Sequence, residues 1–408
     1  MTSLRIRNVG PIKAGVENGA AIKFDGVTLF TGTQGSGKST VAKLYSSLAW
    51  LEKSLQRGDL EIHETLDYEY FMNEVVSFHG LQSYFSEQSY VEYEGQAFRF
   101  LLLNKTFTSE RLTDAPYDSP KIMYVPAERN FLAAIDRPEL ISKLPKALKA
   151  FLSEYVEAKE HYANEALPLS LGNAVFAYES KSKQSFITGA SFRVNLLHAS
   201  SGYQSYVPLV IVTKYLSQFV LKSDKAKQRD LSVALEKRLN KELIKLFEAT
   251  IEKGEELGSI HSAFDALVRR YTYNSFVNIV EEPEQNLFPT SQKQALFEVL
   301  RAVKDKAGNR LVITTHSPFI ISYLNIAIQA FDVYERFNNK QLKNIDAIRD
   351  ICPEASSIDP STTNVYAFCE NGSIEVVERY NGLVADDNQL NNELEETNQL
   401  FSELLWME

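Results

Sequence analysis

The sequence predicts an α/β fold whose mixed sheet has a parallel core and an antiparallel β-subdomain, with a short helical insert. Short apolar segments alternate with helical patterns along much of the chain, which is typical of parallel strands joined by crossovers. Residues 60–120 are aromatic-rich and alternating, which favours antiparallel strands. Residues 139–166 carry many Lys, Glu and Ala at helical spacing, which predicts one or two helices.

Local patterns predict the elements of the first half. Leu4–Val9 and Val27–Thr31 are apolar and β-branched, as strands are. Residues 39–56 predict a helix, because apolar side chains recur at helical spacing at Val41, Leu44, Leu48 and Leu51. The segment IMYVPAERN predicts a further short strand that ends at Pro126.

The second half continues the alternation. A helix is expected after Gly202, and a very polar helical stretch reaches about Leu257. FVNIV (276–280) and RLVIT (310–314) are short buried-type strands, and each is followed closely by acid or histidine and then proline. Residues 386–408 hold seven acids and no base, with apolar residues at helical spacing. We expect this tail to pack on its own domain, and docking on a partner is the alternative.

Length and composition predict a multi-lobed globular protein. The 408 residues are 44% hydrophobic and 24% charged, and no apolar run approaches the roughly 18 residues of a membrane span. The expected parts are an N-terminal lobe (1–130), a helical arm or insert (131–190), a C-terminal lobe (191–330) and a hairpin with an acidic helical tail (331–408). The N-terminus has no signal-peptide pattern, and Cys352 and Cys369 form no disulfide framework, so we expect a cytoplasmic location without a membrane partner.

Net charge bears on nucleic-acid partners. The formal charge of −10 argues against a protein that coats nucleic acid. Residues 222–245 are locally basic, however, so a DNA contact there stays open beside the alternative of a solvated helical face.

A phosphate-binding loop lies between the strand at 27–31 and the helix that follows. Gly32, four residues, Gly37, Lys38 and Ser39 match the loop pattern in its strand–loop–helix context. Backbone N–H groups and the helix N-terminus would cradle phosphate, Lys38 would reach the β- and γ-phosphates, and the Ser39 hydroxyl would bind Mg²⁺. The residues expected to contact a nucleoside triphosphate are Gly32, Thr33, Gln34, Gly35, Ser36, Gly37, Lys38, Ser39 and Thr40.

Acids and a histidine follow the two buried strands of the second half. Glu281 is placed to hold Mg²⁺ through water, and Glu282 to activate the attacking water as general base. His316 ends the neighbouring strand and would sense the γ-phosphate.

A second anion-binding helix N-terminus is predicted at Ser200, Ser201 and Gly202, within the run SSGYQ that ends at Gln204. One nucleotide needs one phosphate cradle. The second cradle is therefore expected to contact a nucleotide that is bound by another subunit.

In this order the motifs resemble those of ABC-type ATPases of the SMC-like branch, which includes the overcoming-lysogenisation-defect ATPases and AAA-family ATPases of bacterial anti-phage defence. SSGYQ resembles the signature motif, IVEEPE the Walker B strand with its catalytic glutamate, and TTHSP the switch histidine. The resemblance implies ATP and Mg²⁺ as ligands and a head-to-tail homodimer with ATP sandwiched at the interface, while further oligomerisation is left open. It places Ser201 and Gly202 on the partner's γ-phosphate and makes Glu282 the catalytic base.

The sequence departs from the family pattern in places. Glu281 stands where many relatives have aspartate, and no clear Q-loop glutamine is found. YVPAERN occupies roughly that position, so Glu128 or Arg129 is a candidate for the part, with an ordinary ion pair at a strand end as the equal alternative. The insert of about 60 residues is too short for a chromosome-tethering arm.

No nuclease domain is expected. Glu370 precedes Asn371-Gly372, which predicts a hairpin turn, and Asp386 and Asp387 follow no convincing strand. The expected function is an ATPase that acts as sensor or regulator for a separate effector, a nuclease or toxin, in anti-phage defence. The alternatives are a DNA-repair or recombination ATPase that binds DNA through residues 222–245, and a transporter's nucleotide-binding subunit.

Overall fold

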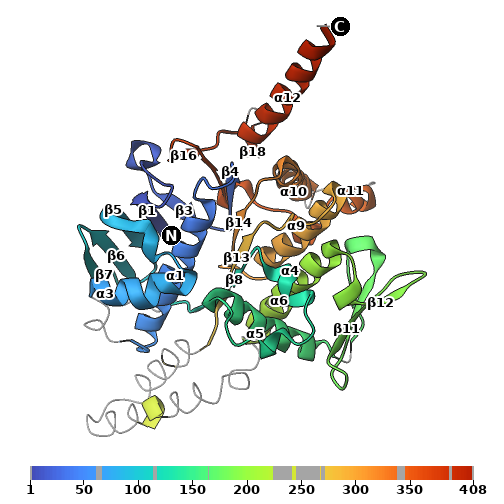
Figure 1. The fold of residues 1–408 in the computed structure, drawn as a ribbon, viewed down its shortest axis with the longest axis horizontal. Helices are drawn as coiled ribbons and strands as arrows, with labels where there is room; N and C mark the ends of the chain where they lie inside the picture. Colours follow the sequence, from blue (N-terminus) through green and yellow to red (C-terminus); the bar gives the residue numbers. More distant parts are fainter. Residues whose placement is uncertain are drawn as a thin grey trace.

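The computed structural model of the chain describes residues 2–60, 67–113, 117–163, 165–223, 241–244, 267, 272–337, 345–385 and 388–406. Figure 1 shows a central sheet flanked by a β-rich lobe that carries the N-terminus and by a helical side, with the C-terminal helix projecting outwards. The mixed α/β class predicted from the sequence is confirmed, since parallel and antiparallel sheets are both present.

The central sheet has seven strands. Five neighbours in it, β15, β4, β14, β13 and β8, run parallel. Because parallel strands end at the same edge, the loops after β4, β13, β14 and β8 meet there. The sheet order is β2 (Gly15–Val16), β16 (Ser373–Val376), β15 (Thr363–Phe368), β4 (Val27–Gly32), β14 (Arg310–Thr314), β13 (Ser275–Glu281) and β8 (Pro120–Val125).

One face of this sheet is covered by α1 (Lys38–Gln56) and the N-terminal β-rich lobe. Phe30, Val277 and Val312 of the sheet share one apolar core with Val41 and Leu44 of α1. The lobe is a five-stranded antiparallel sheet in the order β3 (Ile22–Phe24), β1 (Thr2–Val9), β5 (Phe85–Glu94), β6 (Phe98–Leu103) and β7 (Thr106–Arg111).

The antiparallel prediction for this region is confirmed for β5–β7 and wrong for residues 68–84. Those residues form short helical turns: α3 (Tyr68–Tyr70), η2 (Phe71–Val75), η3 (Val76–His79) and η4 (Gln82–Tyr84). Phe71 and Val75 are both buried, and their spacing of four places them on one side of a helical turn. Aromatic content alone does not distinguish this arrangement from a strand.

The opposite face is covered by helices. Val280 and Ile313 of the sheet pack with residues of α6 (Ser201–Ser223), α9 (Pro289–Lys304) and α10 (Pro318–Phe337) in a second apolar core. Three further helices are α4 (Arg129–Ala133), α5 (Lys146–His161) and α11 (Ile345–Ile351).

The region 131–190 is helical only in its first part. After η5 (Pro138–Leu140) and α5 the chain forms an antiparallel sheet, which contradicts a purely helical insert. Residues 175–179 alternate between buried and less buried side chains, which is the period of a strand. The four strands are β9 (Leu167–Pro168), β10 (Val175–Glu179), β11 (Gln184–Thr188) and β12 (Arg193–Asn195).

The C-terminal region contains the predicted hairpin. Strands β15 and β16 pair antiparallel, Gly372 has a φ of 82°, and Ser373 N donates to Asn371 Oδ1 at 2.8 Å. The hairpin turn at Asn371-Gly372 is therefore confirmed. Short elements lie on either side: η8 (Glu354–Ser356), η9 (Pro360–Thr362), β17 (Arg379–Tyr380) and β18 (Leu383–Val384).

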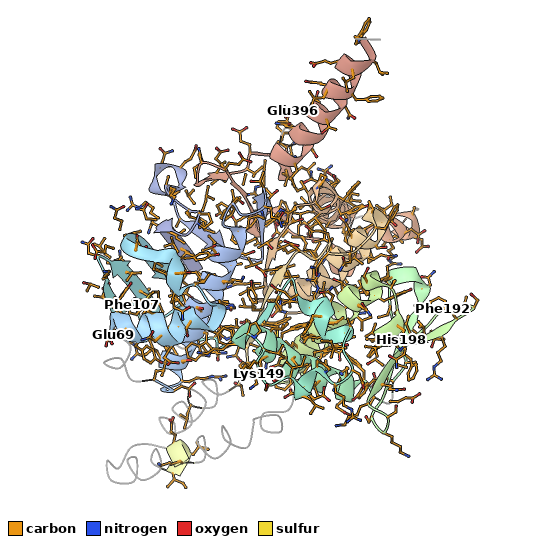
Figure 2. All side chains as sticks on the ribbon, in the orientation of Figure 1. Glu69, Phe107, Lys149, Phe192, His198 and Glu396 are labelled. Carbon is orange, nitrogen blue, oxygen red and sulfur yellow. The ribbon has the colours of Figure 1, made fainter. Side chains whose placement is uncertain are left out.

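The last helix, α12 (Gln389–Trp406), extends away from the rest of the molecule (Figure 1), and Figure 2 shows Glu396 on this projection. Leu390 is buried, but the apolar side chains of the last two turns are exposed: Leu400, Phe401, Leu404, Leu405 and Trp406. The prediction that this tail packs on its own domain is therefore wrong beyond the first turn.

Two predicted segments of the second half lie mostly outside the residues that the structure describes. The polar helical stretch up to Leu257 and the basic segment 222–245 lie outside the described residues, apart from 222–223 and 241–244. Within the part of the chain that the structure describes, no helix has the length and apolarity needed to cross a membrane.

Candidate nucleotide-binding site

The loop between β4 and α1 has the backbone of a phosphate cradle. Gly32, Gly35 and Gly37 have φ values of 136°, 79° and 106°, which side-chain-bearing residues avoid. A Cβ on Gly32 would lie 2.3 Å from the Phe368 carbonyl oxygen, so no other residue fits there. Gln34 and Gly35 are exposed at the tip of the loop, whereas Ser36 and Thr40 are buried and Thr33 and Ser39 are half-buried.

Lys38 lies inside this loop. Its Nζ donates to the carbonyl oxygens of Gly32 and Thr33, both at 2.7 Å, and lies 3.3 Å from His316 Nδ1. Burial lowers the pKa of Lys38 to about 8, against the opposing charges of Glu282 and Glu284. The ammonium group is thus held by groups that a phosphate oxygen could replace.

Glu281 and Ser39 offer ligands of the kind that Mg²⁺ takes. Glu281 ends β13 and is 3% exposed, and its Oε1 accepts no hydrogen bond from any described residue. That Oε1 lies 3.9 Å from Nζ of Lys43, which is one helical turn after Ser39 on the same face of α1. Mg²⁺ binds through one or two protein oxygens plus phosphate oxygens and water, so these residues fit that ion.

Glu282 and His316 contact each other at the carboxyl ends of β13 and β14. The two strands are neighbours, with Glu281 opposite Thr314, and His316 Nε2 lies 3.1 Å from Glu282 Oε1. The hydrogen bond from His316 is the main cause that lowers the pKa of Glu282. Because a carboxylate only accepts, Nε2 carries the proton, and Nδ1 faces Lys38 and the Gly32 carbonyl oxygen at 3.1 Å.

The backbone of Glu282 is strained. Its φ is 44°, in the left-handed region that costs a non-glycine residue about 1 kcal/mol or more. Its N–H donates to the Thr314 carbonyl oxygen at 2.9 Å, which holds this conformation against β14. Backbone strain of this kind is typical of functional sites, where it holds a side chain in a fixed orientation.

Glu284 is a site residue that the sequence interpretation missed. Its Oε1 accepts from Thr315 Oγ1 at 2.6 Å and from His316 N at 2.8 Å, while desolvation raises the pKa of Glu284. Glu284 thereby positions the turn that carries His316. The signal available in the sequence was a third acid in EEPE together with two threonines before the histidine.

Arg129 has a role different from either one predicted for it. Its side chain is fully buried and, among the described residues, donates only to backbone carbonyl oxygens, so it shows neither a surface open to a nucleotide nor a side-chain ion pair. Glu128 is exposed and stays a candidate. The acceptors are Glu281 O and Glu282 O at 2.7 Å, Ser205 O at 3.1 Å and Pro126 O at 3.3 Å.

The predicted second cradle lies at the start of α6. Ser200 and Ser201 are exposed, and Gly202 is half-buried with its Cβ position 3.2 Å from Asn286 O. The Gln204 side chain turns back and donates to Leu196 O at 3.3 Å and Leu197 O at 2.9 Å. Gln204 thus shapes the loop, and the two serines are accessible to another molecule.

Comparisons with known proteins give structural neighbours only. No protein-family model matches this chain, and a search of curated proteins finds no match. The chain is similar to the Smc head bound to the C-winged helix domain of ScpA, with 10% identity, a TM-score of 0.40 and coverage of 92% of this chain and 96% of that one.

Two further solved structures are similar to it. The SMC head domain from Thermotoga maritima has 11% identity and a TM-score of 0.35, over 93% of this chain and 98% of that one. An ATP-binding cassette of an ABC transporter in its ADP conformation has 12% identity and a TM-score of 0.30, over 94% of this chain and 93% of that one. At these values the interpretation of the site depends on this chain's own geometry.

Proposed function

We propose that this chain is an ATPase that binds ATP with Mg²⁺ in the loop Gly32–Thr40 and hydrolyses it. The observation that carries the proposal is the meeting of Lys38, Glu282 and His316 at the carboxyl ends of three parallel strands, with contacts of 3.1 to 3.3 Å. Ligands of open parallel sheets bind at that edge.

In the proposed reaction the chain's own residues bind the phosphates, orient the general base and deprotonate the attacking water. Lys38 exchanges the Gly32 and Thr33 carbonyl oxygens for phosphate oxygens. Glu282, a carboxylate at neutral pH, accepts a proton from the attacking water, and His316 keeps that carboxylate oriented. Bound at Ser39 and Glu281, Mg²⁺ would neutralise charge on the phosphate oxygens.

We propose further that the active unit is a head-to-tail dimer. Ser200 and Ser201 are exposed at the N-terminus of α6, a helix of 23 residues whose dipole favours an anion there. A second copy's γ-phosphate is the anion we assign to it. ATP would then join two subunits, and hydrolysis would release them.

The test uses the Glu282→Gln variant with ATP. Turnover should fall at least about a hundredfold, because the general base is lost, while ATP still binds and dimers accumulate. Adding Ser201→Glu should abolish the dimer and leave ATP binding intact, because a carboxylate repels the partner's phosphate. Light scattering measures the mass, and filter binding measures the ATP bound.

Ser191→Glu is the matched control for the second substitution, since Ser191 is an exposed serine on the β11–β12 turn. It should dimerise as the parent does. Dimers that survive Ser201→Glu would refute the second cradle, and normal turnover in Glu282→Gln would refute the assignment of the base.

A role as regulator of a separate effector, a nuclease or toxin, in anti-phage defence is the biological setting we propose. The exposed apolar residues of α12 support it, because they offer a surface for a partner protein. The DNA-binding alternative rests on residues 222–245, most of which lie outside the described residues, so no structural observation favours it.

A further inference from the structure

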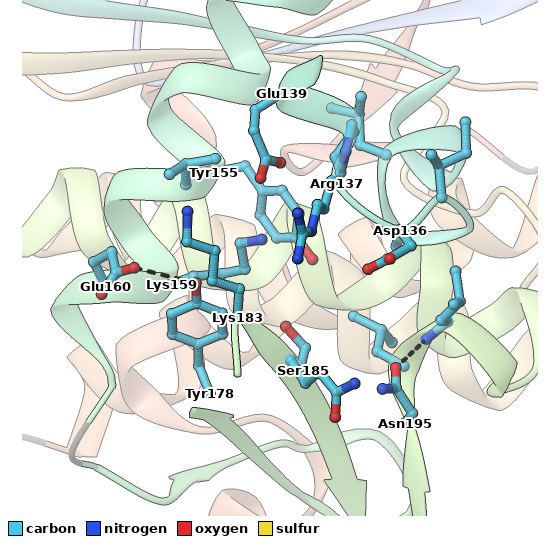
Figure 3. A pocket seen from close by; sticks show the side chains of 18 of the residues that line it. Asp136, Arg137, Glu139, Tyr155, Lys159, Glu160, Tyr178, Lys183, Ser185 and Asn195 are labelled. Carbon is cyan, nitrogen blue, oxygen red and sulfur yellow. Dashed lines mark hydrogen bonds between the residues drawn. The ribbon is translucent and has the colours of Figure 1, made fainter. Parts of the chain in front are cut away.

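A cavity of about 260 Å³ lies beside the loop that leads into Ser200 and Ser201. Its walls come from residues 132–139, from α5, from the β10–β11 hairpin and from η7 (Leu196–His198). Figure 3 shows charged side chains from three of these walls around one space, among them Arg137, Lys159 and Lys183. The volume suits a molecule smaller than the usual drug-sized ligand.

Lys159 is the buried charge of this cavity. It is 9% exposed, and its Nζ lies 4.8 Å from the ring centroid of Tyr155 and 5.2 Å from that of Tyr178. Among the described residues, no carboxylate oxygen lies within 4.0 Å of this Nζ and no acceptor is hydrogen-bonded to it. The ammonium group of this largely buried side chain lines the cavity without an anionic partner, and two aromatic faces offset only part of the cost of its lost hydration.

The nearby acids do not satisfy Lys159. The Glu160 carboxylate accepts from Tyr178 Oη at 3.1 Å and from Ser180 Oγ at 2.7 Å, so it is already engaged. Asp136 and Glu139 line the cavity but are exposed at its rim, as are Arg137 and Lys183. Burial lowers the pKa of Lys159, and Glu139 and Glu160 only partly oppose this.

We propose that this cavity binds a small organic anion whose phosphate or carboxylate group lies among Arg137, Lys159 and Lys183. The binding itself does not depend on the proposed ATPase activity. An occupant of the cavity would nevertheless affect the proposed ATPase activity, because η7 forms one wall of the cavity and ends two residues before Ser200. Gln204 holds Leu196 O and Leu197 O of that wall, so an occupant would bias the loop that presents the two serines.

Pyridoxal 5′-phosphate is the probe, with pyridoxal as its phosphate-free control. The aldehyde condenses with a neutral lysine amine and releases water, and borohydride then reduces the imine to a stable secondary amine that peptide mass mapping locates. Pyridoxal closes to an internal hemiacetal and so reacts more slowly with every amine, and the preference for the phosphate-bearing probe is therefore referred to Lys149, an exposed lysine of the same helix (Figure 2). The ratio of the two rates at Lys159 should exceed the ratio at Lys149 about tenfold, the effect of one charge-assisted contact.

Variants of exposed residues separate the charge effect from misfolding. Arg137→Ala and Lys183→Ala should each reduce the preference for the phosphate-bearing probe by about fivefold, whereas Lys181→Ala, on the same hairpin turn but outside the cavity, should leave it unchanged. Protection by inorganic phosphate would identify a phosphorylated ligand, and protection by acetate a carboxylate. The proposal is overturned if Lys159 prefers the phosphate-bearing probe no more than Lys149 does, or if neither anion protects it. Because no ATP is used, these results are independent of whether the ATPase proposal holds.

Discussion

At the scale of single residues, Lys38, His316 and Glu282 form a continuous polar chain across the strand ends. Lys38 Nζ lies 3.3 Å from His316 Nδ1, and His316 Nε2 lies 3.1 Å from Glu282 Oε1. A change at one member therefore alters the charge that the other two experience. Lys38 and His316 are thus linked directly, without a third group between them.

Lys38 should make the proposed ATP binding pH-dependent. Its pKa in the free protein is lowered from 10.5 to about 8, and the ammonium form is the one that binds phosphate. Affinity should therefore be full below pH 8 and fall up to tenfold per pH unit as pH rises through that value. Equilibrium binding of a non-hydrolysable ATP analogue between pH 6.5 and 9.5 measures it.

The control for this titration is Lys38→Met, which removes the titrating group. Its affinity should be lower throughout and flat across the same pH range. An equally steep decline in Lys38→Met would assign the pH dependence to another group.

At the scale of elements, Arg129 joins the ends of three segments. The guanidinium group binds the carbonyl oxygen of Pro126 after β8, those of Glu281 and Glu282 at the end of β13, and that of Ser205 in the first turns of α6. One side chain therefore connects the start of α6, where the second predicted cradle lies, with the strand end that carries Glu281 and Glu282. If dimer formation shifted α6, the shift would be transmitted through Arg129 to the backbone of Glu282.

Replacing Arg129 should destabilise the protein. In Arg129→Met several buried carbonyl oxygens lose their donors, and each unsatisfied group costs about 1–3 kcal/mol, so we expect a loss of about 3 kcal/mol or more in the free energy of unfolding. Arg129→Lys should fall in between, because one ammonium cannot match the planar fork of donors. Urea unfolding followed by circular dichroism measures the change.

Arg301→Met provides the comparison, since Arg301 is exposed on α9 and surface substitutions rarely exceed about 0.5 kcal/mol. If Arg129→Met lost no more stability than Arg301→Met, the carbonyl contacts would not hold these elements together.

At the scale of the whole molecule, the last two turns of α12 carry apolar side chains that do not pack against the body of the protein. Phe401 and Leu404 are 62% and 64% exposed, on a helix that projects from the body (Figure 1). Exposed apolar surface of this size usually marks a place where another molecule binds. The acids of the same helix make a partner with basic groups around an apolar groove the best complement.

Polar substitutions on α12 should impair binding of a partner protein without reducing the stability of the fold. The triple variant Phe401→Ser, Leu404→Ser, Leu405→Ser should change the free energy of unfolding by less than about 1 kcal/mol and leave ATP turnover unchanged, because these side chains bury little. Under the proposed defence role, phage should form plaques more efficiently on a native host that carries this variant. Leu390→Ser, by contrast, should reduce stability, because Leu390 is buried.

An unchanged plaque count with the triple variant would remove α12 from the proposed effector contact. A marked loss of stability would instead show that these side chains pack on the protein in solution.

The sequence by itself determined the parts whose signal is local. The order of strands and helices around the Gly32–Thr40 loop and the hairpin at Asn371-Gly372 follow from short patterns of residue type. Glycine, proline and apolar spacing act on neighbours in the chain, so they can be interpreted without knowing what packs where.

Only the tertiary structure decided the features that depend on contacts between distant segments. The carbonyl clamp of Arg129, the positioning of His316 by Glu284 and the exposure of α12 each join or separate residues far apart in the sequence. Burial and hydrogen-bond partners are properties of the assembled fold. A buried arginine and a solvated one therefore look the same in the sequence, and packing alone distinguishes them.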